Sequence, residues 1–366
     1  MKILYDHQIF TIQGYGGVSR YFYELLREFN KINDIKTKIS LIFSNNHYIS
    51  DNKIINHLNF FPEKEFKGKR RLMNISNKLV SKVNLKKQNF DLFHPTYYDV
   101  YFLNYIGKKP FVLTVYDMIH EKFKSMFPEE DKTTQYKKLL VEKAAKIIAI
   151  SEITKNDLID IFNVEQGKIE VIYLGNSMSP KSVKISFEMP KYYILFIGFR
   201  GGYKNFDTFL ESVAELLKKN RDLFIICAGG GKFSSSEIMK LEKLDIKKQV
   251  LQFHLDDNTL AYLYKNAILF VFPSIYEGFG IPILEAFACE CPVVCSNISS
   301  LPEVAGDAAE YFNPYEKNSI KSIIERVINS VEIRNKLIDK GKKRLENFSW
   351  KQTALKTKKI YEDILK

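Results

Sequence analysis

Short runs of β-forming residues alternate with amphipathic helical segments along nearly the whole chain, and this alternation restricts the possible folds more than any other feature. Apolar strands separated by helices predict parallel sheets that are covered by helices on both faces. In the first half, strands are expected at residues 2–5, 37–43, 91–94, 111–116, 146–150 and 169–174. Helices are expected at residues 18–30 and 154–162, the second with Ser151 as a possible N-cap.

The alternation stops once, at residues 175–190, where Ser and Pro are frequent and no period is visible. This segment is expected to be a linker. The pattern then resumes, with expected strands at residues 192–198, 223–229, 250–254, 267–273 and 291–296 and expected helices at residues 206–220, 259–267 and 350–366. A chain of 366 residues can form two hydrophobic cores. We therefore predict an α/β protein with two doubly wound, Rossmann-like domains, residues 1–178 and 190–346, that face each other across a cleft.

Composition narrows the class of protein. Hydrophobic residues make up 45% and charged residues 27%, as in ordinary globular proteins. No apolar run approaches the roughly 20 residues that a membrane-spanning helix needs. The chain starts with a strand-like segment in place of the basic, then apolar, pattern of a secretory signal. These features predict a cytoplasmic protein.

Residues 64–87 carry much of the net charge of +12, because they include nine basic residues and one acidic residue. Such a stretch suggests an anionic partner. Apolar residues recur within it at helical spacing among basic ones: Leu72, Ile75, Leu79 and Val83, with Arg71, Lys78 and Lys82 around them. Two interpretations stay open. The segment is either a packed helix with a solvated basic face, or a helix that docks peripherally on anionic lipid at the inner face of the cell membrane.

The most informative motif is YEGFGIPILEA at residues 276–286, in which Glu277 and Glu285 are separated by seven residues. Glu277 follows an expected buried strand, and Pro282 suits the first turn of a helix. A helix N-terminus beside a glycine-containing turn is a ready anion-binding site. Glu285 would lie about one turn into that helix, where a carboxylate can bind a ribose diol through paired hydrogen bonds.

A second motif, GFRGGYKNFDTFL at residues 198–210, places Arg200 and Lys204 in a glycine-containing loop between an expected strand and helix. Two cations beside exposed backbone N–H groups suit a diphosphate. The spacing matches neither the P-loop nor the dinucleotide fingerprint.

Two weaker signals lie in the first half. Gly16 and Gly17 separate the first strand from the first helix, where a Rossmann-like domain offers N–H groups to a phosphate or a sugar. His120 follows an expected buried strand, as His94 also does. Ligands of open α/β sheets bind beyond the carboxyl ends of the strands, so His120 is the stronger candidate of the two.

Taken together, these motifs resemble the family 4 retaining glycosyltransferases of the GT-B fold, and the resemblance extends over essentially the whole chain. It implies that Glu285 holds the ribose hydroxyls of a nucleotide-sugar donor. It also implies that Glu277 faces the transferred sugar, together with the backbone N–H groups of Phe279, Gly280 and Ile281. Arg200 and Lys204 would neutralise the diphosphate, although many members of the family carry Arg at the position of Tyr203.

For the first domain, the resemblance implies that Gly16 and Gly17 approach the phosphates and that His120 lies near the 6-hydroxyl of the donor sugar. Part of residues 347–366, including Trp350, would pack on that domain. By this resemblance the catalytic residues are His120, Glu277, Arg200 and Lys204.

The expected reaction is transfer of a hexose, of mannose or N-acetylhexosamine type, from a GDP- or UDP-linked donor to a saccharide or lipid-linked acceptor in O-antigen or capsule synthesis. No carboxylate is an obvious nucleophile, so we expect front-face substitution with retention. No Asp-x-Asp motif occurs, so we expect neither a cofactor nor a metal. Nucleic acid is not an expected partner.

Two alternatives remain. A sugar-nucleotide 2-epimerase has a similar two-domain build and also binds a diphosphate. A non-catalytic membrane or nucleic-acid binding protein would account for the basic residues 64–87, but it would leave the sugar-nucleotide motifs unexplained.

Overall fold

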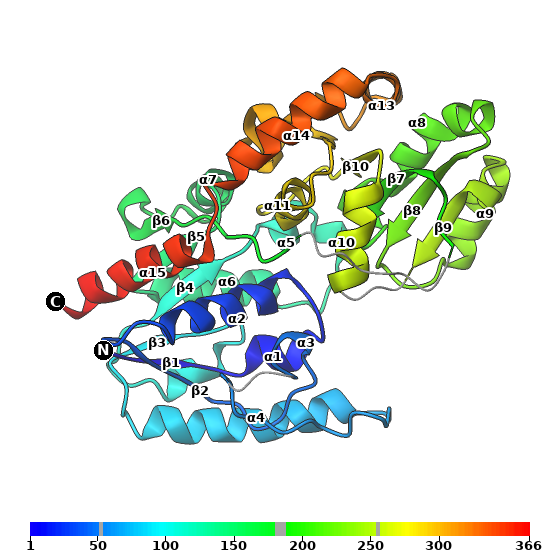
Figure 1. The fold of residues 1–366 in the computed structure, drawn as a ribbon. Helices are drawn as coiled ribbons and strands as arrows, with labels where there is room; N and C mark the ends of the chain where they lie inside the picture. The colour runs from blue at the N-terminus through cyan, green and yellow to red at the C-terminus, as the bar shows by residue number, and fades with distance from the viewer. Residues whose placement is uncertain (51–53, 180–187, 254–256) are drawn as a thin grey trace. The chain divides into compact units, whose positions relative to one another are not determined.

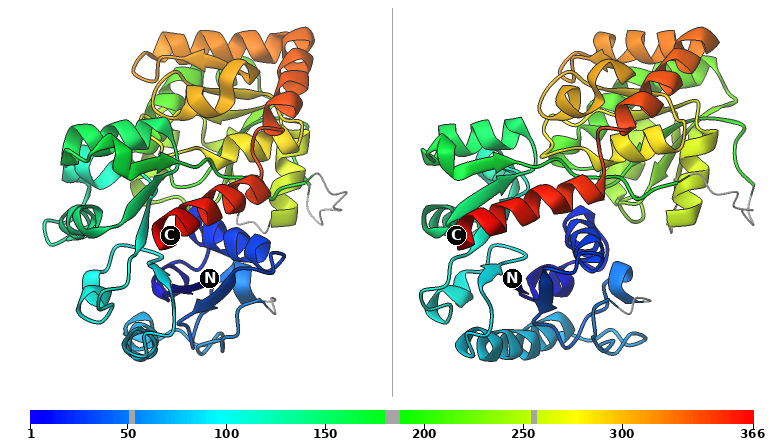
Figure 2. Two further views of the ribbon diagram at one scale, coloured as in Figure 1. Left: turned by 90° about the vertical axis from the view of Figure 1, so that its left-hand side faces the viewer. Right: turned by 60° about the vertical axis from the view of Figure 1, so that its left-hand side comes forward.

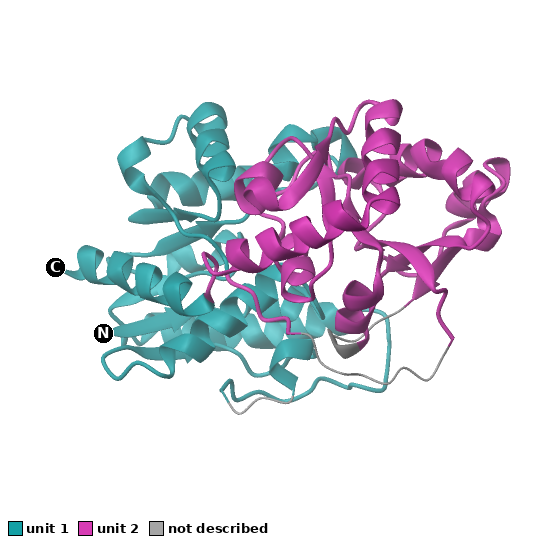
Figure 3. Cartoon of the chain, turned by 45° about the horizontal axis from the view of Figure 1, so that its top comes forward, with its two compact units in different colours: residues 1–174, 350–366 teal, residues 175–349 magenta. Residues whose placement is uncertain are grey.

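The computed structural model describes residues 1–50, 54–179, 188–253 and 257–366. The chain divides into two compact units, residues 1–174 with 350–366 and residues 175–349 (Figure 3). Half of the expected linker, residues 180–187, lies outside the described residues.

Unit 1, residues 1–174 with 350–366, contains two three-stranded parallel sheets. Their strand orders are β2-β1-β3 and β4-β5-β6, and a parallel bridge between Phe93 and Phe111 joins β3 to the start of β4. The strands are β1 (Lys2–Tyr5), β2 (Lys36–Ile39), β3 (Leu92–His94), β4 (Val112–Val115), β5 (Lys146–Ala149) and β6 (Ile169–Val171). Strand β1 has β2 on one side and β3 on the other, so the strand order reverses at the carboxyl end of β1.

Helices connect the strands of unit 1 (Figure 1). They are α1 (Gln8–Ile12), α2 (Gly17–Phe29), α3 (His47–Ser50), α4 (Lys69–Lys86), α5 (Ile119–Lys122), α6 (Thr133–Lys143), α7 (Glu152–Phe162) and α15 (Trp350–Leu365). The Ser151 side chain accepts a hydrogen bond from Thr154 N at 3.1 Å, so the predicted N-cap of α7 is confirmed.

The last helix, α15, belongs to unit 1, as the resemblance implied. It packs beside α2 in both views of Figure 2. The Tyr361 hydroxyl lies 2.9 Å from the Tyr5 hydroxyl of β1 and 2.6 Å from Nδ1 of His94 of β3. Trp350 contacts the ring of Tyr21 in α2. Unit 1 therefore needs the end of the chain to complete its core.

Unit 2, residues 175–349, has one parallel six-stranded sheet of order β12-β11-β10-β7-β8-β9. The strands are β7 (Tyr192–Ile197), β8 (Leu223–Ala228), β9 (Val250–Phe253), β10 (Leu269–Phe272), β11 (Val293–Ser296) and β12 (Ala309–Phe312). The chain runs outward from β7 to β9, returns to β10 beside β7, and continues outward to β12. This order is that of the Rossmann fold, in which ligands bind where the order reverses.

Helices of unit 2 bury a large apolar core against this sheet, for example Phe206, Phe209 and Leu210 of α8 against Phe196 of β7. The helices are α8 (Phe206–Lys219), α9 (Ser235–Lys243), α10 (Asp257–Asn266), α11 (Ile281–Ala288), α12 (Leu301–Ala305), α13 (Lys317–Asn329) and α14 (Val331–Leu345). Both units therefore have the predicted doubly wound architecture.

Three strand predictions differ clearly from the structure. The strand expected at residues 169–174 ends at Val171. The strand expected at residues 37–43 ends at Ile39, because its partner β1 ends at Tyr5. Phe43 pairs only through an isolated bridge with Leu58. Strand β12 was not predicted: it pairs on one side only, with β11, and contains Glu310 among half-buried residues, so its sequence lacks a clear apolar run. His254, expected to end a strand, lies outside the described residues.

Within the part of the chain that the structure describes, no helix has the length and apolar character that crossing a membrane requires.

Candidate active site

The reversal of strand order in unit 2 brings two predicted motifs together. Strands β7 and β10 are neighbours, so the loops after their carboxyl ends leave the same edge of the sheet. The Ile275 N–H, in the loop after β10, donates to the Tyr203 carbonyl, in the loop after β7, at 2.7 Å. The segments around residues 198–205 and 273–280 therefore form one surface, although about 70 residues separate them in the sequence.

Lys204 and Glu277 meet on this surface. Lys204 Nζ lies 2.6 Å from Glu277 Oε1, with side-chain exposures of 16% and 12%. The ammonium group also lies 5.3 Å from the ring centre of Phe272, the last residue of β10. This packing directs the cation and the carboxylate toward one another at the edge where a Rossmann unit binds its ligand.

The turn between Glu277 and α11 is held by hydroxyl groups from the loop after β11. Ser299 Oγ and Ser300 Oγ each lie 2.8 Å from the Glu277 carbonyl, and Ser300 Oγ also lies 2.9 Å from the Phe279 carbonyl. These contacts orient the peptide groups of the predicted sugar-binding turn. The two serines did not stand out in the sequence, because hydroxyl residues in a loop are common there.

Helix α11 starts at Ile281, with Pro282 in its first turn, as predicted. Gly280 precedes it with φ 104°, a left-handed conformation that other residues rarely adopt. A Cβ on Gly280 would also lie 3.1 Å from Leu301 Cδ2. The glycine is therefore required by both the backbone and its surroundings.

Glu285 lies on α11, and its carboxylate is mostly buried. Its Oε2 atom lies 3.1 Å from the Tyr264 hydroxyl of α10, which lies 3.0 Å from the Pro282 carbonyl. Burial and the nearby Glu285 carboxylate raise the pKa of Tyr264 well above its usual value, so this hydroxyl is a stable donor. Tyr264 is a positioning residue that the sequence did not indicate, since it resembles an ordinary core tyrosine.

Arg200 does not join Lys204 on this surface. Its Nε donates to Glu237 Oε1 at 2.5 Å, and its NH1 donates to the Gly229 carbonyl at 3.0 Å. Its NH2 lies within 3.4 Å of the carbonyls of Gly230, Gly231 and Lys232. The guanidinium therefore joins the loops after β7 and β8. The predicted role of Arg200 in binding a diphosphate stays a prediction.

Gly16 and Gly17 lie at the start of α2 in unit 1, as predicted. A Cβ on Gly16 would lie 2.6 Å from Gln13 Oε1, which accepts a hydrogen bond from Ser19 N at 3.1 Å. The absence of a side chain at Gly16 therefore leaves space for Gln13, whose side chain caps the N-terminus of α2. Its predicted approach to a phosphate stays a prediction.

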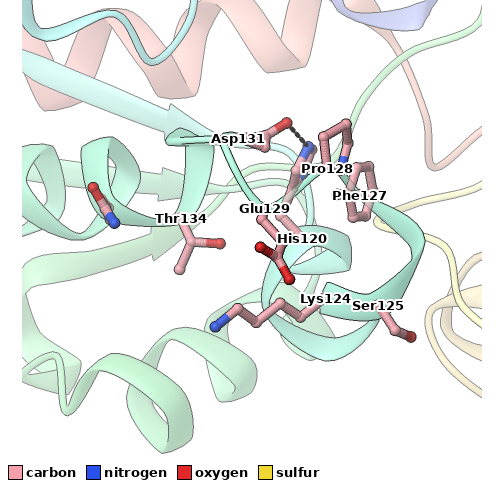
Figure 4. A pocket seen from close by; sticks show the side chains of 9 residues that line it. His120, Lys124, Ser125, Phe127, Pro128, Glu129, Asp131 and Thr134 are labelled. Atoms are coloured by element: carbon pink, nitrogen blue, oxygen red, sulfur yellow. Dashed lines mark ion pairs between the residues drawn. The ribbon is translucent and has the colours of Figure 1, made fainter.

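His120 lies on α5 of unit 1 and lines a pocket of about 620 Å³ (Figure 4). Its ring stacks on Phe127 with a centroid distance of 3.9 Å, and its Nε2 lies 3.7 Å from Asp131 Oδ2. Burial, and then the charge of Lys137, lower the pKa of His120 below its usual value. A neutral imidazole at a pocket can bind a hydroxyl group as donor or acceptor.

His94, the other histidine that follows a strand, is part of the core. Its Nδ1 lies 2.6 Å from the Tyr361 hydroxyl and its Nε2 lies 2.9 Å from Thr114 Oγ1. Complete burial lowers its pKa to about 3, so the ring is neutral. Its contacts support a structural role.

The two Rossmann-like units have the architecture of the GT-B fold. Two family models match the chain: Glycosyltransferase Family 4 over residues 15–176, and Glycosyl transferases group 1 over residues 179–344. The chain belongs to this family of glycosyltransferases.

Individual relatives agree with this assignment. The chain is 30% identical over 234 residues to O-antigen chain mannosyltransferase B of Escherichia coli, a match that covers 61% of each chain. It is 32% identical over 191 residues to O-antigen chain mannosyltransferase RfbU of Salmonella typhimurium, and this match covers 52% of this chain and 53% of the relative. The matched segments thus span somewhat more than half the length of these relatives.

Among solved structures, Anabaena HepE in complex with UDP and glucose is similar to this chain. The TM-score is 0.75 at 16% sequence identity, and the match covers 99% of both chains. At this identity the similarity establishes the fold.

Proposed function

We propose that the protein transfers a hexose from a nucleotide-diphosphate sugar to a saccharide or lipid-linked acceptor. The observation that carries the proposal is the meeting of Lys204 and Glu277 at the strand reversal of unit 2, with Glu285 on the helix that follows. A cation, a sugar-facing carboxylate and a ribose-binding carboxylate are the groups that a nucleotide-sugar requires. The two O-antigen mannosyltransferases that resemble the chain favour a mannose-type donor and a role in surface polysaccharide synthesis.

In the proposed reaction, the bond between the sugar carbon and the diphosphate oxygen breaks as the acceptor oxygen bonds to that carbon. The bonding electrons leave with the diphosphate, which also takes the acceptor proton. Lys204 and the N–H groups of residues 279–281 would stabilise the charge that develops on the donor. Because the leaving group and acceptor use the same face of the sugar, its configuration is retained.

The front-face route is supported by the environment of Glu277. Its Oε1 accepts a hydrogen bond from the Lys204 ammonium at 2.6 Å, and an ion-paired carboxylate is a weak nucleophile. We therefore propose that Glu277 binds the sugar without forming a covalent intermediate. We also propose that the reaction needs no metal, since Lys204 and backbone dipoles would neutralise the diphosphate.

The activity is tested by thermal-shift screening against GDP- and UDP-sugars and then by product analysis with the stabilising donor. We expect stabilisation by one nucleotide class and glycosyl transfer to a saccharide or lipid-linked acceptor, with the same anomeric configuration in product and donor. EDTA should leave the rate unchanged. Isomerised donor in the absence of acceptor would instead support the 2-epimerase, and inversion at the sugar carbon would contradict the front-face route.

We further propose that α4 docks the protein on an anionic membrane. The helix packs on unit 1 through another face, which carries Met73, Asn77, Ser81 and Leu85. Asn77 anchors this face: its Oδ1 accepts from the N–H groups of Ile42 and Phe43 at 3.0 and 2.9 Å. The apolar stripe found in the sequence is therefore not the packed face.

The stripe lies in solvent instead. Leu72, Ile75, Leu79 and Val83 have exposed fractions of 51%, 47%, 58% and 51%. Exposed basic residues lie at both ends of the helix: Arg70, Arg71, Lys86 and Lys87. Apolar residues along a helix with a basic flank suit the boundary between headgroups and acyl chains of an anionic bilayer. Figure 1 shows α4 as a long helix along an outer edge of unit 1.

Flotation with vesicles tests this surface. The protein should bind phosphatidylglycerol-containing vesicles, bind less to pure phosphatidylcholine vesicles, and lose much of its binding in high salt. The double variant Leu79→Asp/Val83→Asp should fold normally, because both side chains are exposed, and should lose most of the bound fraction. Met239→Asp, at a residue of unit 2 that is 68% exposed, is the matched control and should bind like the wild type. Equal binding to both kinds of vesicle, or normal binding by the double variant, would reject the proposal.

A further inference from the structure

A buried lysine lies directly behind the turn that carries His120. Lys137 of α6 has a side-chain exposure of 0%, and that of its partner Glu121 is 2%. Lys137 Nζ donates to Glu121 Oε2 at 2.8 Å and to the Asp117 carbonyl at 2.9 Å. It also lies 5.1 Å from the centre of the Tyr98 ring. The ammonium group thus has two oxygen acceptors and an aromatic face around it.

The two acceptors of Lys137 bracket His120 in the sequence. Asp117 follows β4, and its Oδ1 atom accepts from Ile119 N at 3.0 Å, which starts the short helix α5. Glu121 follows His120 directly on that helix. One ammonium therefore ties down both ends of a five-residue turn, and the imidazole lies between the two attachment points.

Stability alone does not account for this arrangement. Taking a lysine and a glutamate out of water is costly, and replacing such a pair by apolar residues is often neutral or stabilising. A buried pair does, however, fix geometry, because moving either partner leaves an uncompensated charge. The feature that this geometry fixes is the position of His120 at the pocket of Figure 4.

We infer that Lys137 is a positioning residue, which acts through Asp117 and Glu121 to hold His120 at the pocket as a neutral hydrogen-bonding group. The charged groups around His120 and its pocket come from several elements: Asp117, Glu121, Lys124, Glu129, Asp131 and Lys137. The positive charge of Lys137 lowers the pKa of His120 and so favours the uncharged ring. The carboxylates of Asp117, Asp131 and Glu121 favour the charged ring. Burial acts in the same direction as Lys137 and is the larger cause of the lowered pKa.

The inference rests on the proposed function only for its effect on turnover, so it is tested first without turnover. The pKa of His120 is measured by NMR titration of the imidazole in the full chain. Lys137→Met removes the cation and should raise this pKa. Glu121→Gln keeps an oxygen acceptor for Lys137 but removes the anion, and should lower it. Lys138→Met, at the exposed neighbouring position of α6, should have no effect.

The opposite signs separate positioning from general damage to the fold, which would move both variants alike. If Lys137→Met does not fold, Lys137→Gln, which removes the charge but keeps a polar donor for Glu121 and the Asp117 carbonyl, is measured in its place. An unchanged His120 pKa in the folded variants would overturn the inference.

In a transfer assay, Lys137→Met should move the acid limb of the kcat/KM profile to higher pH, because His120 would be protonated over a wider range. The expected NMR shifts without any transferase activity in the wild type would reject the proposed function and leave the inference standing.

Discussion

Replacing Lys204 with methionine is expected to lower kcat by about 10²- to 10³-fold, the usual effect of removing one preorganised group that stabilises developing charge. The leaving diphosphate gains negative charge in the transition state, and Lys204 is the cation at the strand reversal of unit 2. The affinity for the unreacted donor should fall less, because the charge that Lys204 opposes is greatest in the transition state. Steady-state kinetics with the donor identified by thermal shift measures both quantities.

The controls for Lys204→Met separate charge from folding. Lys243→Met changes an exposed lysine of the same unit and should leave kcat unchanged. Removing Lys204 also leaves Glu277 without its partner, so Glu277→Gln should be combined with Lys204→Met in a double-mutant cycle. If the double variant recovers kcat, Lys204 acts only by pairing with Glu277, and the proposed role at the diphosphate is wrong.

Replacing Glu285 with alanine is expected to weaken the binding of UDP or GDP by roughly 10- to 100-fold. Hydrogen bonds to a charged group contribute about 1.5–3 kcal/mol, and each 1.4 kcal/mol is a factor of about ten in affinity. The buried position of Glu285 on α11 strengthens this expectation, since water does not compete freely for the carboxylate. Isothermal titration calorimetry with the free nucleotide is the measurement, because it needs no acceptor.

A graded series tests the role of Glu285. Tyr264→Phe keeps the carboxylate but removes its hydroxyl partner at 3.1 Å, and should weaken binding only about fivefold, the effect of one ordinary hydrogen bond. Glu290→Ala, just beyond the end of α11, breaks surface pairs with Lys265 and Lys342 and should leave the affinity unchanged. Unchanged nucleotide affinity in Glu285→Ala would refute its assignment to the ribose.

Most strands of both units were predictable because they are short, strongly apolar runs between polar segments, whereas β2, β6 and β12 each contain polar residues. The predicted N-cap at Ser151 and the helix start at Pro282 were also correct. These features depend on residues within a few positions of one another, so local sequence determines them. The spacing of Glu277 and Glu285 is also a local feature, because one turn and the helix that follows it carry both residues.

The candidate site contains residues that no local pattern could identify. Tyr264 and Ser300 contact the site residues across 21 and 23 positions of the chain. A tyrosine in a helix or a serine in a loop has many equally ordinary roles. Only the pairing of strands brings these groups beside the motif, so their function follows from the sheet order.

The sequence alone determined most of the strands and helices and the two-unit α/β architecture, and it indicated which loops carry charge suited to a nucleotide-sugar. The sequence could not determine which partner a side chain contacts, because a local pattern is compatible with more than one side-chain direction. Arg200 and Lys204 share one loop, yet Arg200 turns to Glu237 and Lys204 turns to Glu277. On α4, the apolar stripe that begins at Leu72 is exposed, and the more polar stripe that begins at Met73 is buried. In each case contacts with distant parts of the chain make the choice, because burial and charge pairing depend on neighbours that only the folded protein provides.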